Sequence, residues 1–255
     1  MRKTIYDILK SSFKNNKSWD YYNNSNDFGG EFPFLSKELS VRFLKNFIKV
    51  SGKAEQELVA QIDKIGDRVT HTVSVFFIGH FIYQNTIIKN KIDTELSKLE
   101  QDSVKSCKID FPYVWFLTCL FHDLGYEIEN ENILKYGNID DLVSKSKKLN
   151  SIIGVPLNYS SNYEKYFHYR IEKNCKNDHG IVAAHLLFDS LCSIRRISES
   201  NTKSNLCWDK GLENVYNFCA WNILAHNIWY VNEEDECNSK SYETAGLSDL
   251  ILMLC

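Results

Sequence analysis

A histidine and an aspartate stand side by side at the end of a strongly apolar segment of the sequence. His122 and Asp123 follow the run from Trp115 to Phe121. The helix is expected to end at Gly125, because glycine has the free φ that a helix end needs. Imidazole nitrogen and carboxylate oxygen suit divalent metal ions of hard to borderline character. The pair alone does not identify a metal site, since it also arises by chance or as an ion pair at a helix C-terminus.

Three more histidines lie near the ends of other helix-like segments. They are His71, His179 and His226, and each belongs to a separate segment. Helices whose ends converge can present such side chains to one pocket, and buried packing holds the ligands in place. For each histidine, a place in the core with one ordinary hydrogen bond is the alternative. The candidate metal ligands are His71, His122, Asp123, His179 and His226.

The other three histidines are not expected at this site. His80 comes nine positions after His71, which places it on the opposite side of a helix at about 100° per residue. His185 is likewise off the face of His179, which lies six positions earlier. His168 lies in a polar segment. We therefore interpret these three as residues without a role in metal binding.

Composition and charge favour one helical domain. Of 255 residues, 44% are apolar and 25% charged, which is ordinary globular usage, and 3 prolines with 11 glycines are few for a turn-rich β protein. The net charge of −3 argues against binding of duplex nucleic acid, which needs a basic face. We expect an all-α protein, and its many apolar helices are compatible with a homodimer.

No feature of the sequence indicates export or a membrane. The first residues contain no apolar core of a signal peptide, and no run reaches the roughly 18 apolar residues of a membrane span. None of the 8 cysteines forms a CxxC pair, which argues against a zinc knuckle. A cytoplasmic location is therefore expected, with no membrane partner.

Apolar periodicity predicts a series of helices. Residues 68–90 are apolar nearly all round, which predicts a buried central helix, whereas the charged residues 90–104 are predicted to be exposed. Ser36 is a candidate N-cap for a helix that Gly52 ends. The polar, lysine-rich residues 127–177 form a long insertion that could cover a pocket. The predicted helices are 36–52, 55–65, 68–90, 111–123, 178–188, 212–229 and 247–255.

The order of the candidate ligands resembles that of the HD-domain superfamily of metal-dependent phosphohydrolases. That family has a histidine on a helix, then a His-Asp doublet, then two histidines in members with two metals, and a late aspartate. The resemblance covers residues 66–255. It implies an HD-domain helical bundle over residues 61–255, with an insertion at about 127–177, after an N-terminal helical extension at residues 1–60. The similar local sequences are Arg68-Val69-Thr70-His71-Thr72, Phe121-His122-Asp123-Leu124-Gly125, Asp178-His179-Gly180 and Ala225-His226-Asn227.

The resemblance also implies a role for each candidate ligand. His71 and His122 would hold one ion, and His179 and His226 a second. Asp123 would bind and orient between them or beside one, and His122 and Asp123 would be the catalytic pair. The implied cofactor is one or two divalent ions, with Mn, Fe, Co, Ni, Zn and Mg all open. Such an ion lowers the pKa of bound water toward about 7 and so supplies a nucleophile.

Two positions depart from the family pattern. The late aspartate would fall just after Cys255, and Asp249 lies about two helical turns too early, so we expect the chain to be truncated in its last helix. Many members carry a phosphate-binding lysine where this chain has Tyr126, for which Arg68 is either a replacement or an ordinary surface residue. The candidates for substrate binding are Arg68, Tyr126, Lys173 and Lys176.

The resemblance implies the function of a phosphohydrolase or phosphodiesterase. The expected partner is a small phosphorylated substrate, namely a nucleotide, a cyclic nucleotide or another small phosphate ester, hydrolysed by a metal-activated water. Three alternatives remain open: an HD-type di-iron oxygenase, a catalytically silent nucleotide-binding regulatory domain, and an all-α domain whose histidines are structural. Phosphate release, an oxygen-dependent product and ligand binding without turnover would distinguish them.

Overall fold

The computed structural model describes residues 3–14, 31–51, 56–101, 109–126 and 211–226, with short pieces at 179–180, 183–184, 186–188 and 190–192. This part of the chain is mainly helical and contains no strand, so the prediction of an all-α protein is confirmed for the described residues. None of its helices is both long and apolar enough to cross a lipid bilayer. The predicted insertion at 127–177, with Lys173 and Lys176, and the predicted helix 247–255 lie outside the described residues.

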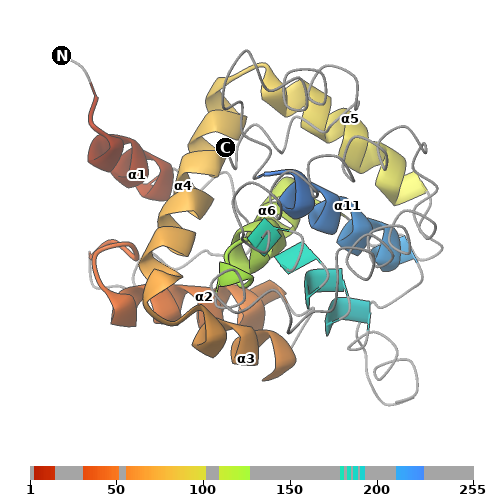
Figure 1. Ribbon diagram of the computed structural model, residues 1–255. Helices are drawn as coiled ribbons and strands as arrows, with labels where there is room; N and C mark the ends of the chain where they lie inside the picture. Colours follow the sequence, from red (N-terminus) through yellow and green to blue (C-terminus); the bar gives the residue numbers. More distant parts are fainter. Residues whose placement is uncertain are drawn as a thin grey trace, which may run out of the picture.

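One helix, α6, occupies the middle of the described structure (Figure 1). It contacts α3, α4, α5 and α11, while α1 and α2 pack against α4. The residues that directly follow α6, from His122 to Gly125, therefore lie buried inside the helical assembly. The helices are α1 (Ile5–Lys14), α2 (Lys37–Ser51), α3 (Gln56–Ile65), the 3-10 turn η3 (Gly66–Arg68), α4 (Val69–Asn85), α5 (Ile88–Gln101), α6 (Phe111–Phe121) and α11 (Gly211–Ala225).

The sequence of α6 explains both its start and its central position. Asp110 caps the helix by accepting a hydrogen bond from the backbone N–H of Tyr113 at 3.3 Å, and Pro112 occupies the first turn, where proline is tolerated. Every side chain from Phe111 to Phe121 is buried, as expected for a helix that is apolar all round. The polar pair that follows α6 is consequently carried into the interior.

Helix α4 differs from the predicted central helix in length and in burial. It ends before Thr86, whose backbone is extended, so the predicted helix 68–90 is divided between α4 and α5. One face of α4 is buried, but apolar residues of the other face are only half-buried, because the packing partners of the helix do not enclose it. The half-buried apolar residues include Val75, Ile78 and Ile82.

Helix α5 is more buried than its charge suggests. Residues 90–104 were predicted to be exposed, and this was wrong for Ile92 and Leu96, which are both buried. These two residues are one helical turn apart, so they share a face of α5. The face is narrow, and the lysines and acids on either side of it conceal the apolar pattern in the sequence.

Aromatic side chains join α1, α2, α4 and α6 into one hydrophobic core. The ring of Phe47 on α2 stacks on that of Phe116 on α6, with centroids 4.1 Å apart. Phe13 on α1 meets Phe77 on α4 edge to face, with centroids 5.6 Å apart. The described helices of the predicted N-terminal extension therefore share the core that positions the start of α4 and the end of α6.

His80 also lies in this core, against the rings of Phe76 and Phe111, and burial lowers its pKa from 6.5 to about 3. The folded state thus keeps His80 neutral, whereas the unfolded chain binds a proton below about pH 6.5. Stability is therefore complete above that pH and falls as the pH falls toward 3, with a loss of roughly 2 kcal/mol at about pH 5 from this group.

A His80→Leu variant tests this pH dependence. Urea unfolding of both proteins at about pH 7 and about pH 5 gives the change in the free energy of unfolding, and we expect the change to be smaller in the variant by roughly 2 kcal/mol. An equal change in the two proteins would show that His80 does not carry this part of the acid sensitivity.

Candidate metal centre

All five candidate ligands lie close together, although they come from four separate parts of the chain. His71 is in the first turn of α4, His122 and Asp123 follow α6, His179 belongs to a short helical piece, and His226 follows α11. They form two groups, His71 with His122 and Asp123, and Asp123 with His179 and His226. Within each group the potential ligand atoms lie within 4.8 Å of one another, so each group could hold a metal ion.

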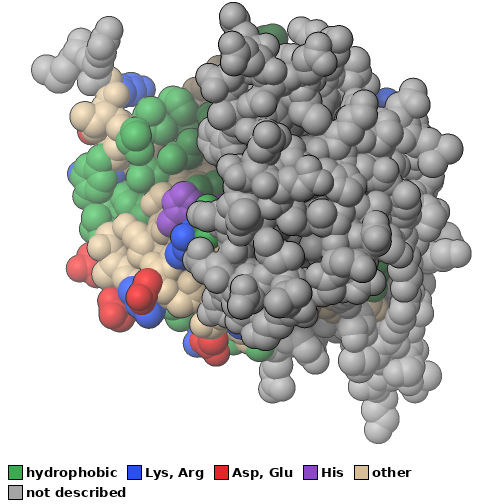
Figure 2. All heavy atoms as spheres, in the orientation of Figure 1, with side chains coloured by type: hydrophobic (Ala, Val, Ile, Leu, Met, Phe, Trp, Pro, Cys, Tyr) green, Lys and Arg blue, Asp and Glu red, His purple; other side chains and the backbone are tan. Residues whose placement is uncertain are grey.

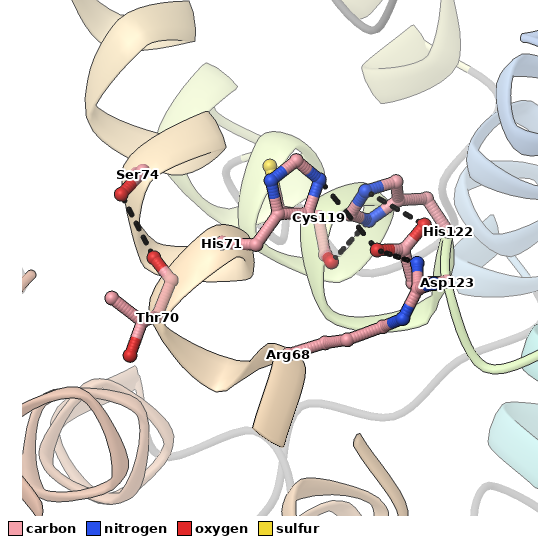
Figure 3. A network of polar contacts seen from close by, with 7 residues as sticks. All are labelled: Arg68, Thr70, His71, Ser74, Cys119, His122 and Asp123. Carbon is pink, nitrogen blue, oxygen red and sulfur yellow. Dashed lines mark hydrogen bonds and ion pairs between the residues drawn. The ribbon is translucent and has the colours of Figure 1, made fainter. Parts of the chain in front are cut away.

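The first group surrounds the carboxylate of Asp123 (Figure 3). Oδ1 of Asp123 is 3.2 Å from Nε2 of His122, and Oδ2 is 3.6 Å from Nε2 of His71. The side chain of Asp123 is only 5% exposed, whereas that of His71 is 57% exposed. Figure 2 likewise shows histidine atoms at the surface, beside a hydrophobic area. The first group is therefore open to solvent on the side of His71.

The second group is closed. Asp123, His179 and His226 are all buried, and the imidazole rings of the two histidines meet edge to face with centroids 5.1 Å apart. The ring of His226 also approaches that of His122, at 5.8 Å. Asp123 is thus the residue that connects an open group of ligands to a buried one.

Two of the histidines have their ring orientation fixed by the backbone. Nδ1 of His122 donates a hydrogen bond to the carbonyl oxygen of Cys119 at 2.7 Å, and Nδ1 of His226 donates to that of Ile223. A carbonyl oxygen can only accept, so Nδ1 carries the proton in both rings. Each acceptor is one of the last four carbonyls of its helix, and that of Ile223 also accepts the backbone N–H of His226 at 3.3 Å. Both histidines therefore direct the lone pair of Nε2 away from the backbone, as metal-binding histidines do.

The contact between His122 and Asp123 fits a bound cation. Burial lowers the pKa of His122, so its imidazole is neutral at neutral pH, with its proton on Nδ1. The lone pair of Nε2 then faces the Oδ1 oxygen of Asp123 at 3.2 Å, with no hydrogen between two acceptors. A divalent ion held by both atoms would remove this conflict, and imidazole with carboxylate is a donor set that such ions accept.

Arg68 and Tyr126 lie beside the ligands. The guanidinium of Arg68 contacts Oδ2 of Asp123 at 3.2 Å and lies over the ring of Tyr126, with Cζ 3.5 Å from the centroid. Burial of Arg68 opposes its charge, but contacts with Tyr126 and Asp123 outweigh this and raise its pKa above the usual value. The ring of Tyr126 in turn stacks on that of His179, with centroids 3.7 Å apart. Arg68 is therefore more than an ordinary surface arginine.

Of the remaining residues considered in the sequence, the described structure includes His80. His80 is buried in the core and belongs to neither group of potential ligands. Lys173, Lys176, His168 and His185 lie outside the described residues.

The expectation that Gly125 ends the helix because of its free φ was wrong. Its φ is not in the left-handed region, and the helix already ends at Phe121. A Cβ atom on Gly125 would lie 2.1 Å from the carbonyl oxygen of His179, so the position needs glycine because another part of the chain passes close to it. No local sequence signal reveals a contact between residues so far apart.

Comparison of the chain with protein-family models, with curated proteins and with solved structures gave no significant match in any of the three. The chemistry of the centre must therefore be argued from its own residues.

Proposed function

We propose that the chain is a metal-dependent phosphohydrolase that acts on a small phosphate ester such as a nucleotide or cyclic nucleotide. The observation that carries the proposal is the shared carboxylate of Asp123, which lies within ligand distance of two histidine pairs. A pair of metal sites with a common carboxylate is suited to displacement at phosphorus, where charge must be neutralised on several oxygens at once. The order of the candidate ligands, which resembles that of the HD-domain superfamily, supports the same function.

Each residue has a defined task in this proposal. When bound, divalent ions lower the pKa of a coordinated water toward about 7 and neutralise phosphoryl oxygens. His122 and His226 present Nε2 to the centre in a fixed orientation, because their Nδ1 atoms are held by backbone carbonyls. Asp123 supplies the negative charge common to both sites. The buried second group keeps water away from one side of the centre, which strengthens electrostatic interactions there.

Among the described residues, Arg68 is the one that we expect to receive the phosphate. One nitrogen of its guanidinium contacts Asp123, and its side chain is 46% exposed on the open side of the centre, as is that of His71 at 57%. A guanidinium can donate two parallel hydrogen bonds to the oxygens of a phosphate, and Asp123 holds this one in place. The substrate is therefore expected to approach between Arg68 and His71.

The direct test is phosphate release from a panel of nucleotides, cyclic nucleotides and simple phosphate esters with Mn²⁺ added. Turnover that requires the metal is expected for at least one class of ester. Arg68→Gln should raise KM about ten- to hundredfold, because a charge-assisted hydrogen bond contributes about 1.5–3 kcal/mol. Arg42→Gln, which changes an exposed arginine on α2, is the matched control and should leave KM unchanged.

A chain that binds Mn²⁺ but releases phosphate from no ester would refute hydrolysis. Iron content and oxygen-dependent product formation would then be measured, since an oxygenase can use the same kind of ligand set. Equal KM values for the Arg68→Gln variant and the unchanged protein would remove Arg68 from the substrate site.

A further inference from the structure

Gly125 and Tyr126, which follow the His-Asp pair after Leu124, make two contacts with His179. The backbone of His179 passes so close to Gly125 that a Cβ atom there would lie 2.1 Å from the carbonyl oxygen and 2.8 Å from Cα of His179. The ring of Tyr126 stacks on the imidazole of His179, with an interplanar angle of 22° and centroids 3.7 Å apart. One contact therefore fixes the backbone of His179 and the other fixes its ring.

Arg68 also lies over the Tyr126 ring, and two groups within 4 Å of one ring centroid must lie on opposite faces of the ring. Cζ of Arg68 lies 3.5 Å from the ring centroid, a distance at which a guanidinium is attracted to the face of an aromatic ring. The tyrosine ring is thus held between a cation and an imidazole. Arg68 contacts Asp123, which belongs to both groups of ligands, whereas His179 belongs only to the buried, second group.

We infer that Gly125 and Tyr126 form a clasp that positions His179 in the second group of ligands and sets the orientation of Arg68. The clasp makes Tyr126 a positioning residue that couples the phosphate-binding arginine to the second metal site. The part that concerns Arg68 rests on the proposed function. The part that concerns His179 requires only that the centre binds metal.

The contacts explain why one tyrosine can serve both sides. His179 comes from a segment more than fifty positions away in the chain, so its approach to Asp123 depends on tertiary contacts and not on local geometry. A flat ring offers one face to an imidazole and the other to a guanidinium, which an aliphatic side chain cannot do. Phenylalanine would preserve both faces and lose only the hydroxyl.

Titration with Mn²⁺ alone, followed by calorimetry, tests the clasp without any need for turnover. Tyr126→Leu should lower the affinity for one of the two ions about ten- to hundredfold, because the loss of a residue that orients a metal ligand typically has an effect of this size. The affinity for the other ion should not change. Gly125→Ala should lower the affinity for the same ion, because the added methyl group displaces His179. Tyr126→Phe should bind both ions within about threefold of the unchanged protein, since the ring remains.

Inorganic phosphate added to the Mn²⁺-loaded proteins tests the link to Arg68. Tyr126→Leu should weaken phosphate binding. The double variant with Arg68→Gln should lose much less affinity for phosphate than the product of the two single effects, because both changes act on one guanidinium. Circular dichroism and thermal unfolding of each variant show whether the fold is retained, and Tyr126→Phe provides the rescue that a general packing defect would not give.

Binding of both ions by Tyr126→Leu with unchanged affinity would overturn the clasp. Equal losses in Tyr126→Phe and Tyr126→Leu would also overturn it, since the ring would then be irrelevant. Failure of the proposed function would give a different result. No ester would then be hydrolysed, while the Mn²⁺ affinities of the variants would still follow the pattern expected from the clasp.

Discussion

Replacing Asp123 by asparagine is expected to lower kcat/KM by roughly 10³-fold or more, because the metal-dependent stabilisation of the transition state is worth several kcal/mol and about 1.4 kcal/mol corresponds to a factor of ten. Asp123 is the one residue common to both groups of potential ligands in the described structure. Loss of its charge therefore weakens both sites at once. Steady-state phosphate release with Mn²⁺ measures the effect.

The same substitution should not destabilise the protein when metal is absent. An asparagine at this position can donate a hydrogen bond from its amide to Nε2 of His122, where the carboxylate now presents a second acceptor at 3.2 Å. The lost contact with Arg68 costs little, because the guanidinium that remains is half-exposed and water can solvate it. Thermal unfolding of the metal-free proteins is expected to give equal or higher stability for the variant.

Added Mn²⁺ should reverse this order. At a concentration about 100 times its dissociation constant, a ligand stabilises a protein by about 2.7 kcal/mol per site. The unchanged protein should gain this stability and Asp123→Asn should not. Asp93→Asn is the matched control, because Asp93 pairs with Lys89 on α5 and belongs to neither group of potential ligands. Equal stabilisation of Asp123→Asn and Asp93→Asn by Mn²⁺ would contradict a metal site at Asp123.

A second large effect is expected from Gly79→Ala, on stability and not on chemistry. A Cβ atom at Gly79 would lie 2.1 Å from Cε2 of Trp115, well inside contact distance. Trp115 cannot move aside easily, because it is fully buried and its indole N–H donates to the carbonyl oxygen of Phe76 at 3.0 Å. Overpacking of this kind costs about 1–3 kcal/mol and occasionally more, and we expect about 3 kcal/mol. Urea unfolding measures it.

The cause can be isolated by a double-mutant cycle. Trp115→Phe removes the indole atoms that the new methyl group would meet, so Gly79→Ala should be less harmful in that background by about 1 kcal/mol or more. If Gly79→Ala lowers stability equally with and without the Trp115→Phe change, the loss is not due to this contact. The contact between Gly79 and Trp115 joins α4 to α6, so the cycle measures the packing between these two helices.

The sequence allowed the helical class and the meeting of the ligands to be predicted for physical reasons. Helices such as α6 are apolar all round, so their burial can be predicted from the sequence. His122 and Asp123 interrupt that pattern at its end, and polar residues that break a local rule are often functional. The resemblance to the HD-domain superfamily implied which histidines accompany Asp123, and the structure brings these residues close together.

Other features depended on tertiary contacts that periodicity does not encode. The need for glycine at Gly125 arises from the passing backbone of His179, and the role of Tyr126 from the rings above and below it. The burial of Ile92 depends on its neighbours in space, because the surrounding sequence of α5 is mostly charged. The residue type determines the chemistry of a side chain, whereas the folded structure determines which residues that side chain contacts.

The number of Mn²⁺ ions bound per chain is the measurement that tests the account most directly. Equilibrium dialysis with metal analysis of the unchanged protein, His226→Gln and Asp123→Asn would provide it. We predict two ions for the unchanged protein, one for His226→Gln, which retains the group of His71, His122 and Asp123, and none held tightly by Asp123→Asn. An unchanged protein that binds no ion, or an Asp123→Asn variant that binds as many ions as the unchanged protein, would contradict a metal centre built on this aspartate.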